Sequence, residues 1–292
     1  FFGLTRRPVR SPSRSRRYRR TPGRYWNSAS GAQLKALPRP EAMNPLLDPN
    51  ARLVIAHRGN RAQAPENTME ALRHAVALGV DALEIDVRAT RDGVLVLMHD
   101  DTLDRTTSGR GLVADAQFAD VQPLDAGRAS AAWTGPKVAV PTLEEVLDQF
   151  RETAFIIEIK AVAAAEPTSR MVHRFGAQAR VVVGSQESEV CQRMYRSGLR
   201  TCASKGDAIR LIPLAMAGLT PARPRYDVLS ITPSVRGVPI PVLRMAAAAR
   251  RAGVATQVWT VNDPARAVDL WRGGVAGIVT DDPEAMLRVR TG

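Results

Sequence analysis

Acidic side chains interrupt two apolar segments of this chain. Glu84 and Asp86 stand within "ALEIDV", and Glu158 stands within "FIIEI", two residues ahead of Lys160. Residues two apart in a β-strand point to the same side, so Glu84 and Asp86 would face one site. Burying three acids together is costly unless a cation compensates their charge. Oxygen donors without cysteine favour a hard ion, so we predict that these acids bind Mg²⁺ or Ca²⁺.

Two of the four histidines also end apolar segments. His57 ends "LVIAH", and His99 ends "VLVLMH". Histidine titrates near neutral pH and therefore suits proton transfer as an acid or as a base. Taken alone, either could equally be a core or loop residue. A catalytic interpretation therefore requires a fold that brings both histidines to the acids.

The chain from residue 51 onward alternates between short apolar runs and helix-period segments, which favours a parallel sheet. The expected strands are 53–57, 82–87, 154–159, 180–184, 199–203, 227–231, 255–260 and 277–280. The expected helices are 67–78, 142–150, 168–177, 187–196, 206–217, 241–251 and 264–272. The first helix should begin with a capping box in "NTME", formed by Asn67 and Glu70, and end at Gly79.

One connection breaks this alternation. The turn signal Asp92-Gly93 leaves too few residues for a parallel crossover, so 94–98 should fold back as a hairpin arm. Eight strands remain, in about 240 residues, which is the size and rhythm of a (β/α)₈ barrel. A doubly wound sheet is the second choice, because no G-x-G-x-x-G turn follows the first strand. In a barrel the carboxyl ends of the strands would bring His57, His99 and the acids to one mouth.

The first 50 residues differ from the rest in charge. They carry 11 Lys/Arg and 2 Asp/Glu, against 30 and 27 in residues 51–292. We interpret 1–50 as a basic extension, disordered over 1–42, with Met43 as the natural start. Its composition also fits a nucleic-acid arm or a mitochondrial transit peptide, although we expect no specific nucleic-acid partner.

The body of the chain lacks the signals of a membrane or secreted protein. No apolar stretch has the length of a membrane helix, so we expect no transmembrane segment. Cys191 and Cys202 make neither a disulfide framework nor a zinc site, and we interpret them as buried thiols. We expect a cytoplasmic protein.

Several segments together resemble one enzyme family. They are "AHRG", "PENTMEAL", "LEIDVRATRDGVLVLMHDDTLDRTTSGRG", "PTLEEVL", "IIEIK", "QVWTVND" and "GIVTDDP", in that order over roughly residues 53–284. The ordered set resembles the glycerophosphodiester phosphodiesterase family. The resemblance implies a (β/α)₈ TIM barrel over 51–292 with a small insertion at about 100–140. It also implies hydrolysis of a small-molecule glycerophosphodiester to glycerol 3-phosphate and an alcohol.

The same resemblance implies a role for each candidate residue. The ligands of a divalent cation would be Glu84, Asp86 and Glu158, and the acid/base pair would be His57 and His99. The phosphate contacts would be Arg58 and Lys160, and Trp259 would line the substrate pocket. Arg58 could instead pair with a carboxylate, and Lys160 with Glu158. Ser185-Gln186 departs from the Ser-Phe that relatives often carry, which affects the expected leaving-group pocket.

Two other functions stay open from the sequence. A phospholipase D-like enzyme acting on lysolipids would use the same barrel, but it would need an exposed apolar rim. A nucleic-acid-binding or anionic-surface-binding protein would use the basic extension and would not need a complete catalytic set. The set is complete here, so we favour the hydrolase.

Overall fold

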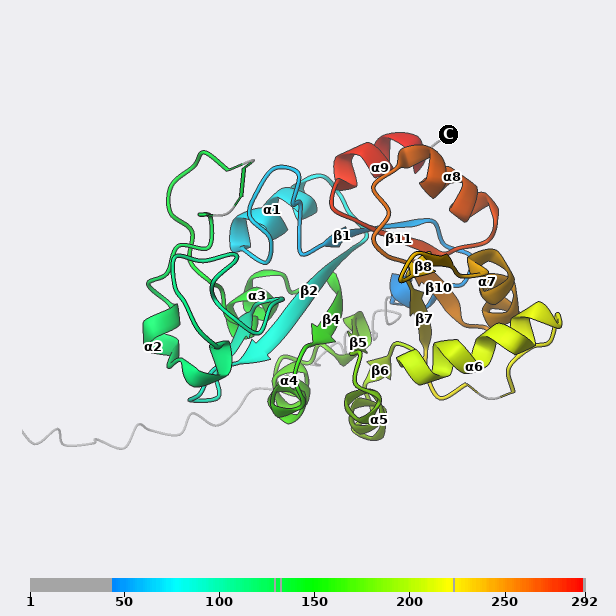
Figure 1. The fold of residues 1–292 in the computed structure, drawn as a ribbon, viewed down its shortest axis with the longest axis horizontal. Helices are drawn as coiled ribbons and strands as arrows, with labels where there is room; N and C mark the ends of the chain where they lie inside the picture. The colour runs from blue at the N-terminus through cyan, green and yellow to red at the C-terminus, as the bar shows by residue number, and fades with distance from the viewer. Residues whose placement is uncertain (1–43, 129, 132, 223, 291–292) are drawn as a thin grey trace, which may run out of the picture. The chain divides into compact units, whose positions relative to one another are not determined.

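The computed structural model describes residues 44–128, 130–131, 133–222 and 224–290. Within them, eight parallel strands pair in the order β6-β5-β4-β2-β1-β11-β10-β7. A single bridge between Cys202 and Val228 joins the two ends of this order. The sheet thus curves into a nearly closed barrel with helices around it, as Figure 1 shows, and the predicted (β/α)₈ barrel is confirmed.

The barrel strands agree closely with the predicted segments. They are β1 (Leu53–His57), β2 (Ala82–Ala89), β4 (Ala154–Ile159), β5 (Val181–Gly184), β6 (Arg200–Thr201), β7 (Val228–Ile231), β10 (Ala255–Val258) and β11 (Gly277–Thr280). The hairpin arm is also present: β3 (Leu95–Leu97) pairs antiparallel with the end of β2. A short hairpin of β8 (Ser234–Val235) and β9 (Val238–Pro239) follows β7.

The helices that cover the barrel are likewise close to the predicted ones. They are α1 (Met69–Ala77), α3 (Leu143–Gln149), α4 (Val162–Arg174), α5 (Ser188–Arg196), α6 (Lys205–Met216), α7 (Val242–Arg251) and α8 (Pro264–Arg272). A further helix, α9 (Pro283–Arg290), was not among the predicted ones. Helix α4 begins six residues before its predicted start, with Pro167 inside it. The helix continues through Pro167. Ala164 and Ala165, in the turn before the proline, are buried against the apolar core and hold this part of α4 in place.

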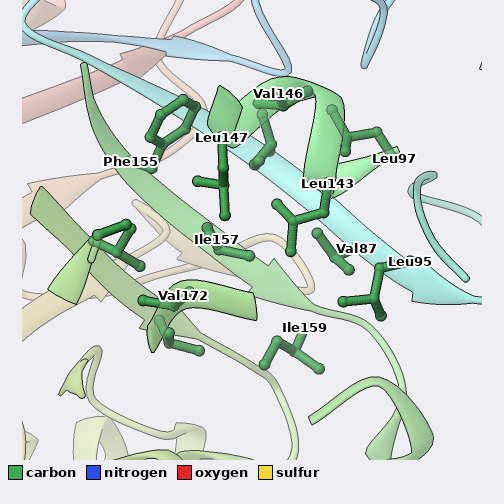
Figure 2. Packing of buried hydrophobic residues seen from close by; sticks show 14 of the residues in the cluster. Val87, Leu95, Leu97, Leu143, Val146, Leu147, Phe155, Ile157, Ile159 and Val172 are labelled. Carbon is green, nitrogen blue, oxygen red and sulfur yellow. The ribbon is translucent and has the colours of Figure 1, made fainter. Parts of the chain in front are cut away.

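Strand alternation explains which side chains reach the barrel interior. On β4, Phe155, Ile157 and Ile159 point outward and pack against Leu143 and Leu147 of α3 and their neighbours (Figure 2). The intervening residues of β2 and β4 must then point inward. The outward apolar positions are buried under helices, and this burial drives closure of the barrel. The acids of the two strands occupy inward positions near their carboxyl ends.

The amino end of the barrel is closed by residues that precede β1. A 3₁₀ helix, η1 (Pro45–Leu47), buries Leu46 completely among the first residues of several strands, including Leu53, Ala82 and Ala154. The basic extension was predicted to reach residue 50. Residues 44–50 instead belong to the barrel, because Leu46 fills its lower end. The predicted disorder of 1–42 concerns residues outside the described part of the chain.

The predicted insertion lies between β3 and α3. It contains η2 (Val113–Asp115) and α2 (Phe118–Val121), and it has a small apolar core with Leu103, Val121 and Val140. The insertion therefore packs on itself beside the barrel. No helix in the part of the chain that the structure describes is long and apolar enough to cross a membrane.

Candidate active site

The predicted acids meet at the carboxyl end of the barrel. Strand register pairs Asp86 with Glu158 directly, and Glu84 lies one inward position below Asp86 on β2. One oxygen from each carboxylate lies within 4.8 Å of the others. Burial, together with the negative charges of Asp86 and Glu158, raises the pKa of Glu84 well above its usual value. This crowding of like charges favours a bound cation.

Two basic side chains lie against this acid cluster. Nε of Arg58 is 2.9 Å from Oδ2 of Asp86, and Nζ of Lys160 is 2.9 Å from both Oδ1 of Asp86 and Oε1 of Glu158. Although burial alone would raise it, the charges of Lys160 and Arg58 hold the pKa of Asp86 below its usual range. The carboxylate pairing considered for Arg58 and Lys160 is therefore present, and it places both cations beside the cluster.

His57 is joined to the cluster and to the far end of the chain. It pairs with Glu84 in the β1–β2 register, and its Nε2 lies 3.9 Å from Oε2 of that residue. Its Nδ1 lies 2.7 Å from Oδ1 of Asp281, which follows β11. Burial alone would raise the pKa of Asp281, but the hydrogen bond from His57 lowers this pKa below its usual value. Asp281 is thus ionised, so Nδ1 of His57 donates and Nε2 remains for other chemistry.

His99 follows β3 and has the same kind of partner. Its Nδ1 lies 2.7 Å from Oδ1 of Asp100, the next residue in the chain. The guanidinium of Arg88 donates from Nε and Nη2 to the carbonyl oxygen of His99, at 3.1 and 2.9 Å. His99 and Asn67 line the same small cavity. Both histidines therefore have Nδ1 bound to a carboxylate.

Asn67 contributes to the site rather than to a helix cap. Its Nδ2 donates to Oδ2 of Asp86 at 2.9 Å, and its Oδ1 accepts from the Asp86 backbone N–H at 3.2 Å. The predicted capping box of Asn67 and Glu70 is wrong, because Thr68 is the N-cap and accepts from the N–H of Ala71. Asn67 has a φ of 55°, a left-handed conformation that asparagine tolerates. That conformation turns its amide toward Asp86.

The loop that carries these residues packs closely on α1. Gly59 has a φ of 85°, and a Cβ on it would lie 2.6 Å from the backbone carbonyl carbon of Ala71. Only glycine allows this approach. The backbone N–H of Arg58 in the same loop donates to Oε2 of Glu84 at 3.1 Å. Loop and acid cluster are thus built as one unit.

The remaining predicted residues lie around the mouth. Trp259 follows β10, and 37% of its surface is exposed. Its backbone N–H donates to the carbonyl oxygen of Ile231 at 3.0 Å, which ties it to β7. Ser185 follows β5 and donates from its hydroxyl to the carbonyl oxygen of Ile159 at 2.8 Å. Gln186 follows it directly, at the carboxyl end of the strand.

The donor set fits a hard divalent cation. With all three carboxylates ionised, as cation ligands must be, they leave one net negative charge against the two basic side chains. A divalent cation would reverse this to one net positive charge, which complements a phosphodiester anion. The residues that would hold it are Glu84, Asp86 and Glu158.

Sequence reasoning gave no role to several residues that hold this site together. They are Arg61, Glu66, Arg88, Arg105 and Asp281, and all form ion pairs or hydrogen bonds within or beside the site. Glu66, Arg105 and Asp281 lie inside the quoted segments "PENT", "LDRTT" and "TDDP". That position was an available signal, but the loops in between give no spacing from which their partners could be inferred.

Known proteins resemble this chain over most of its length. The profile of the Glycerophosphoryl diester phosphodiesterase family matches residues 57–285. A glycerophosphodiester phosphodiesterase of Caldanaerobacter subterraneus subsp. tengcongensis is 31% identical over 248 residues, which cover 81% of this chain and 97% of that protein. A Bacillus subtilis glycerophosphodiester phosphodiesterase is 31% identical over 269 residues, covering 85% and 89%.

Solved structures give the same result. A glycerophosphodiester phosphodiesterase of Agrobacterium tumefaciens superposes with a TM-score of 0.66 at 28% identity, covering 81% of this chain and 99% of that one. A phosphodiesterase of Oleispira antarctica, solved in complex with the product sn-glycerol-3-phosphate, has a TM-score of 0.68 at 25% identity and covers 82% and 97%.

The barrel and these matches place the chain among enzymes that cleave phosphoric diesters. More particularly, the chain belongs to the Glycerophosphoryl diester phosphodiesterase family.

Proposed function

We propose that this protein hydrolyses glycerophosphodiesters to glycerol 3-phosphate and an alcohol, and that the reaction depends on a divalent cation. The observation that carries this proposal is the meeting of Glu84, Asp86 and Glu158 with two basic residues at one mouth. The names of the relatives, and the product bound by the Oleispira antarctica enzyme, support the same substrate class.

The acid cluster and its basic partners would bind the phosphate. A divalent cation held by the three carboxylates, Mg²⁺ or Ca²⁺, would neutralise phosphoryl oxygens and stabilise the charge that develops on them. Arg58 can offer two N–H groups to phosphate oxygens, and Lys160 a compact charge. Both side chains are largely buried and already paired with acids, so they are held in place before substrate arrives.

The two histidines would carry the protons. Nδ1 of His57 and Nδ1 of His99 are both bound to carboxylates, which leaves Nε2 of each ring for exchange with a reacting oxygen. One histidine would remove the proton from the nucleophile, and the other would protonate the leaving alkoxide. The nucleophile is water or the substrate's own glycerol hydroxyl, which would give a cyclic phosphate first. Following the ³¹P signal during turnover distinguishes the two.

Metal removal tests the proposal. Release of glycerol 3-phosphate from glycerophosphocholine should stop in chelator and return with Mg²⁺ or Ca²⁺. Glu158→Gln should lower the cation affinity measured by calorimetry by at least about tenfold, because it removes a ligand charge. Glu144→Gln, an exposed acid on α3, is the matched control and should bind as the wild type does. Full turnover after exhaustive metal stripping would contradict the proposal.

A lysolipid is a second candidate substrate. The β8–β9 hairpin after β7 exposes two apolar residues, Val235 and Val238, and 67% of the surface of Val238 is accessible. A rat lysophospholipase D is 31% identical over 179 residues, which cover only 58% of this chain and 57% of that protein. If the hairpin contacts an acyl chain, exchanging both valines for serine should slow cleavage of lysophosphatidylcholine and leave glycerophosphocholine unaffected. Equal effects on both substrates would exclude that contact.

We also propose a cytoplasmic location. Both cysteines of the chain, Cys191 and Cys202, are free and buried. Free thiols are usual in a reducing compartment. Localisation of the full chain carrying a fluorescent label at its carboxyl end tests this directly, and a secreted or periplasmic signal would contradict it.

A further inference from the structure

A chain of charged side chains leads from His57 to Glu66. Oδ1 of Asp281 accepts from Nδ1 of His57 at 2.7 Å and from Nη1 of Arg61 at 2.7 Å. Nη2 of Arg61 in turn lies 3.1 Å from Oε2 of Glu66. Glu66 thus supports, through one arginine, the carboxylate that fixes the His57 ring.

A second chain leads from His99 to the same carboxylate. Oδ1 of Asp100 accepts from Nδ1 of His99 at 2.7 Å, and Oδ2 of Asp100 accepts from Nε of Arg105 at 2.6 Å. The other end of the Arg105 guanidinium donates to both oxygens of Glu66, at 2.7 and 3.0 Å. The two chains have the same order of groups: imidazole, aspartate, arginine, Glu66.

The surroundings of Glu66 suit a fixed junction. Its side chain is 9% exposed, and Nη1 of Arg58 also donates to it, at 2.9 Å. Burial alone would raise its pKa, but the hydrogen bond from Arg105 and the charges of Arg58 and Arg61 lower the pKa of Glu66 to about 2. Removing this charge would leave three guanidinium groups close together without their shared carboxylate, which is strongly unfavourable.

We propose that Glu66 is a positioning residue that orients His57 and His99 together. It acts through Arg61 toward His57 and through Arg105 toward His99. A carboxylate at Nδ1 fixes the tautomer and the direction of an imidazole. Here each carboxylate accepts in turn from an arginine that also contacts Glu66, and Asp281 has a further donor in Nδ2 of Asn262 at 2.9 Å. The catalytic half of this inference rests on the proposed acid/base role of the histidines; the structural half does not.

The structural half is tested by NMR of the imidazole nitrogens. In protein labelled with ¹⁵N-histidine, Glu66→Gln should shift the Nδ1 signals of both His57 and His99. Arg61→Gln should shift the His57 signal, and Arg105→Gln the His99 signal. Glu70→Gln, a change in the first turn of α1 where the acid pairs with Arg73, is the matched control and should shift neither. This readout needs no substrate, so it stands even if the proposed reaction is wrong.

The catalytic half is tested by kinetics on glycerophosphocholine. Small displacements of catalytic groups can cost about 10²-fold, so Glu66→Gln should lower kcat by about that factor while KM changes much less. Arg61→Gln and Arg105→Gln should each give part of this loss, and Glu66→Gln should add little to the variant that lacks both arginines. Glu66→Asp, which keeps the charge, should recover part of kcat.

Three results would overturn the proposal. Unmoved histidine signals in Glu66→Gln would show that Glu66 does not orient the rings. A rise in KM without loss of kcat would show that Glu66 acts on phosphate binding, through Arg58, and not on the histidines. If Glu66→Gln does not fold, Glu66→Asp takes its place, because the shorter side chain should still shift both signals; unchanged signals in a folded Glu66→Asp would again contradict the proposal.

Discussion

The two histidines at the mouth each pair with an aspartate, but different parts of the fold hold them in place. His57 lies on β1, its side chain is 12% exposed, and its aspartate follows β11, near the other end of the described chain. His99 follows the short strand β3, its side chain is 34% exposed, and its aspartate is the next residue. One of the two proposed proton-transfer groups is thus held by the barrel, and the other by the hairpin and the insertion beside it.

The two histidines therefore differ in how firmly the fold holds them and in how far solvent reaches them. A residue on a barrel strand is fixed by pairing on both sides, whereas a residue on a surface loop has fewer constraints. The His57 ring is therefore the more firmly held of the two, and the His99 ring is the more accessible to solvent.

The largest effect is expected from removing either ring. His57→Ala and His99→Ala should each lower kcat by about 10²–10⁴-fold, the usual range for general acid or base catalysis. The double variant should lose less than the product of the two, because the pair acts as one unit. His173→Ala, an exposed residue on α4, is the control. Near-full activity in either single variant would remove that histidine from the mechanism.

Replacing each aspartate by asparagine tests how far each histidine depends on its carboxylate partner. Asp281→Asn should lower kcat by about 10²-fold, because a buried ring then loses the group that fixes its tautomer. Asp100→Asn should cost about tenfold, since water can reach the more exposed His99 and replace part of the contact. Steady-state kinetics measure both. A larger loss in Asp100→Asn would reverse the comparison.

Acid stability gives a smaller difference. The pKa of Asp281 is lowered in the folded protein, so its contribution to stability is present above the unfolded value, near 4, and is lost as pH falls through the folded value. Asp281→Asn should therefore reduce the free energy of unfolding by about 1.5–3 kcal/mol at pH 7 and by less toward pH 3. Urea denaturation across this range measures it. A pH-independent difference would contradict the assignment.

The same test on Asp100 should give a weaker response. The pKa of Asp100 is also lowered, chiefly by its hydrogen bond from Arg105. That arginine is 45% exposed, so solvent screens the pair. Asp100→Asn should thus change stability less than Asp281→Asn at neutral pH. Equal losses would mean that the insertion holds its histidine as firmly as the barrel does.

The smallest effect concerns the helix cap beside the His57 loop. Thr68→Ala should cost about 1 kcal/mol and lower kcat a few-fold, because Thr68 directly follows Glu66 and Asn67. Thr142→Ala removes the comparable cap of α3 and should cost the same stability with kcat unchanged. Thermal denaturation and kinetics together separate the two. Loss of kcat in both variants would indicate a general effect of destabilisation.

Much of this molecule follows from strand alternation. The pattern of "ALEIDV" puts Leu83 and Ile85 outside, so Glu84 and Asp86 must point inward, and parallel strands end at one mouth. The hairpin arm followed from Asp92-Gly93, which does form the turn before β3. Periodicity and turn chemistry are local properties, and for this reason the sequence shows them.

The wrong predictions, and the contacts that the sequence does not predict, share a different cause. Asn67 was assigned to a helix cap because its left-handed backbone conformation, which aims its amide at Asp86, leaves no periodic signal. Asp281 lies 224 residues from His57, and no spacing links the two. The sequence places Leu46 in the extension because a single buried leucine at the end of the barrel produces no hydrophobic periodicity in the residues around it. Contacts between loops depend on the closed fold, so only the structure identifies them.

The seal formed by Leu46 has a practical use. The side chain sits among the first residues of the barrel strands, and Nε2 of Gln257 donates to its carbonyl oxygen at 3.4 Å. Asn44, the first residue that the structure describes, therefore lies at the end of the barrel opposite the acid cluster. An affinity handle or a surface tether attached directly to Asn44 would immobilise the barrel with the acid cluster facing the bulk solution.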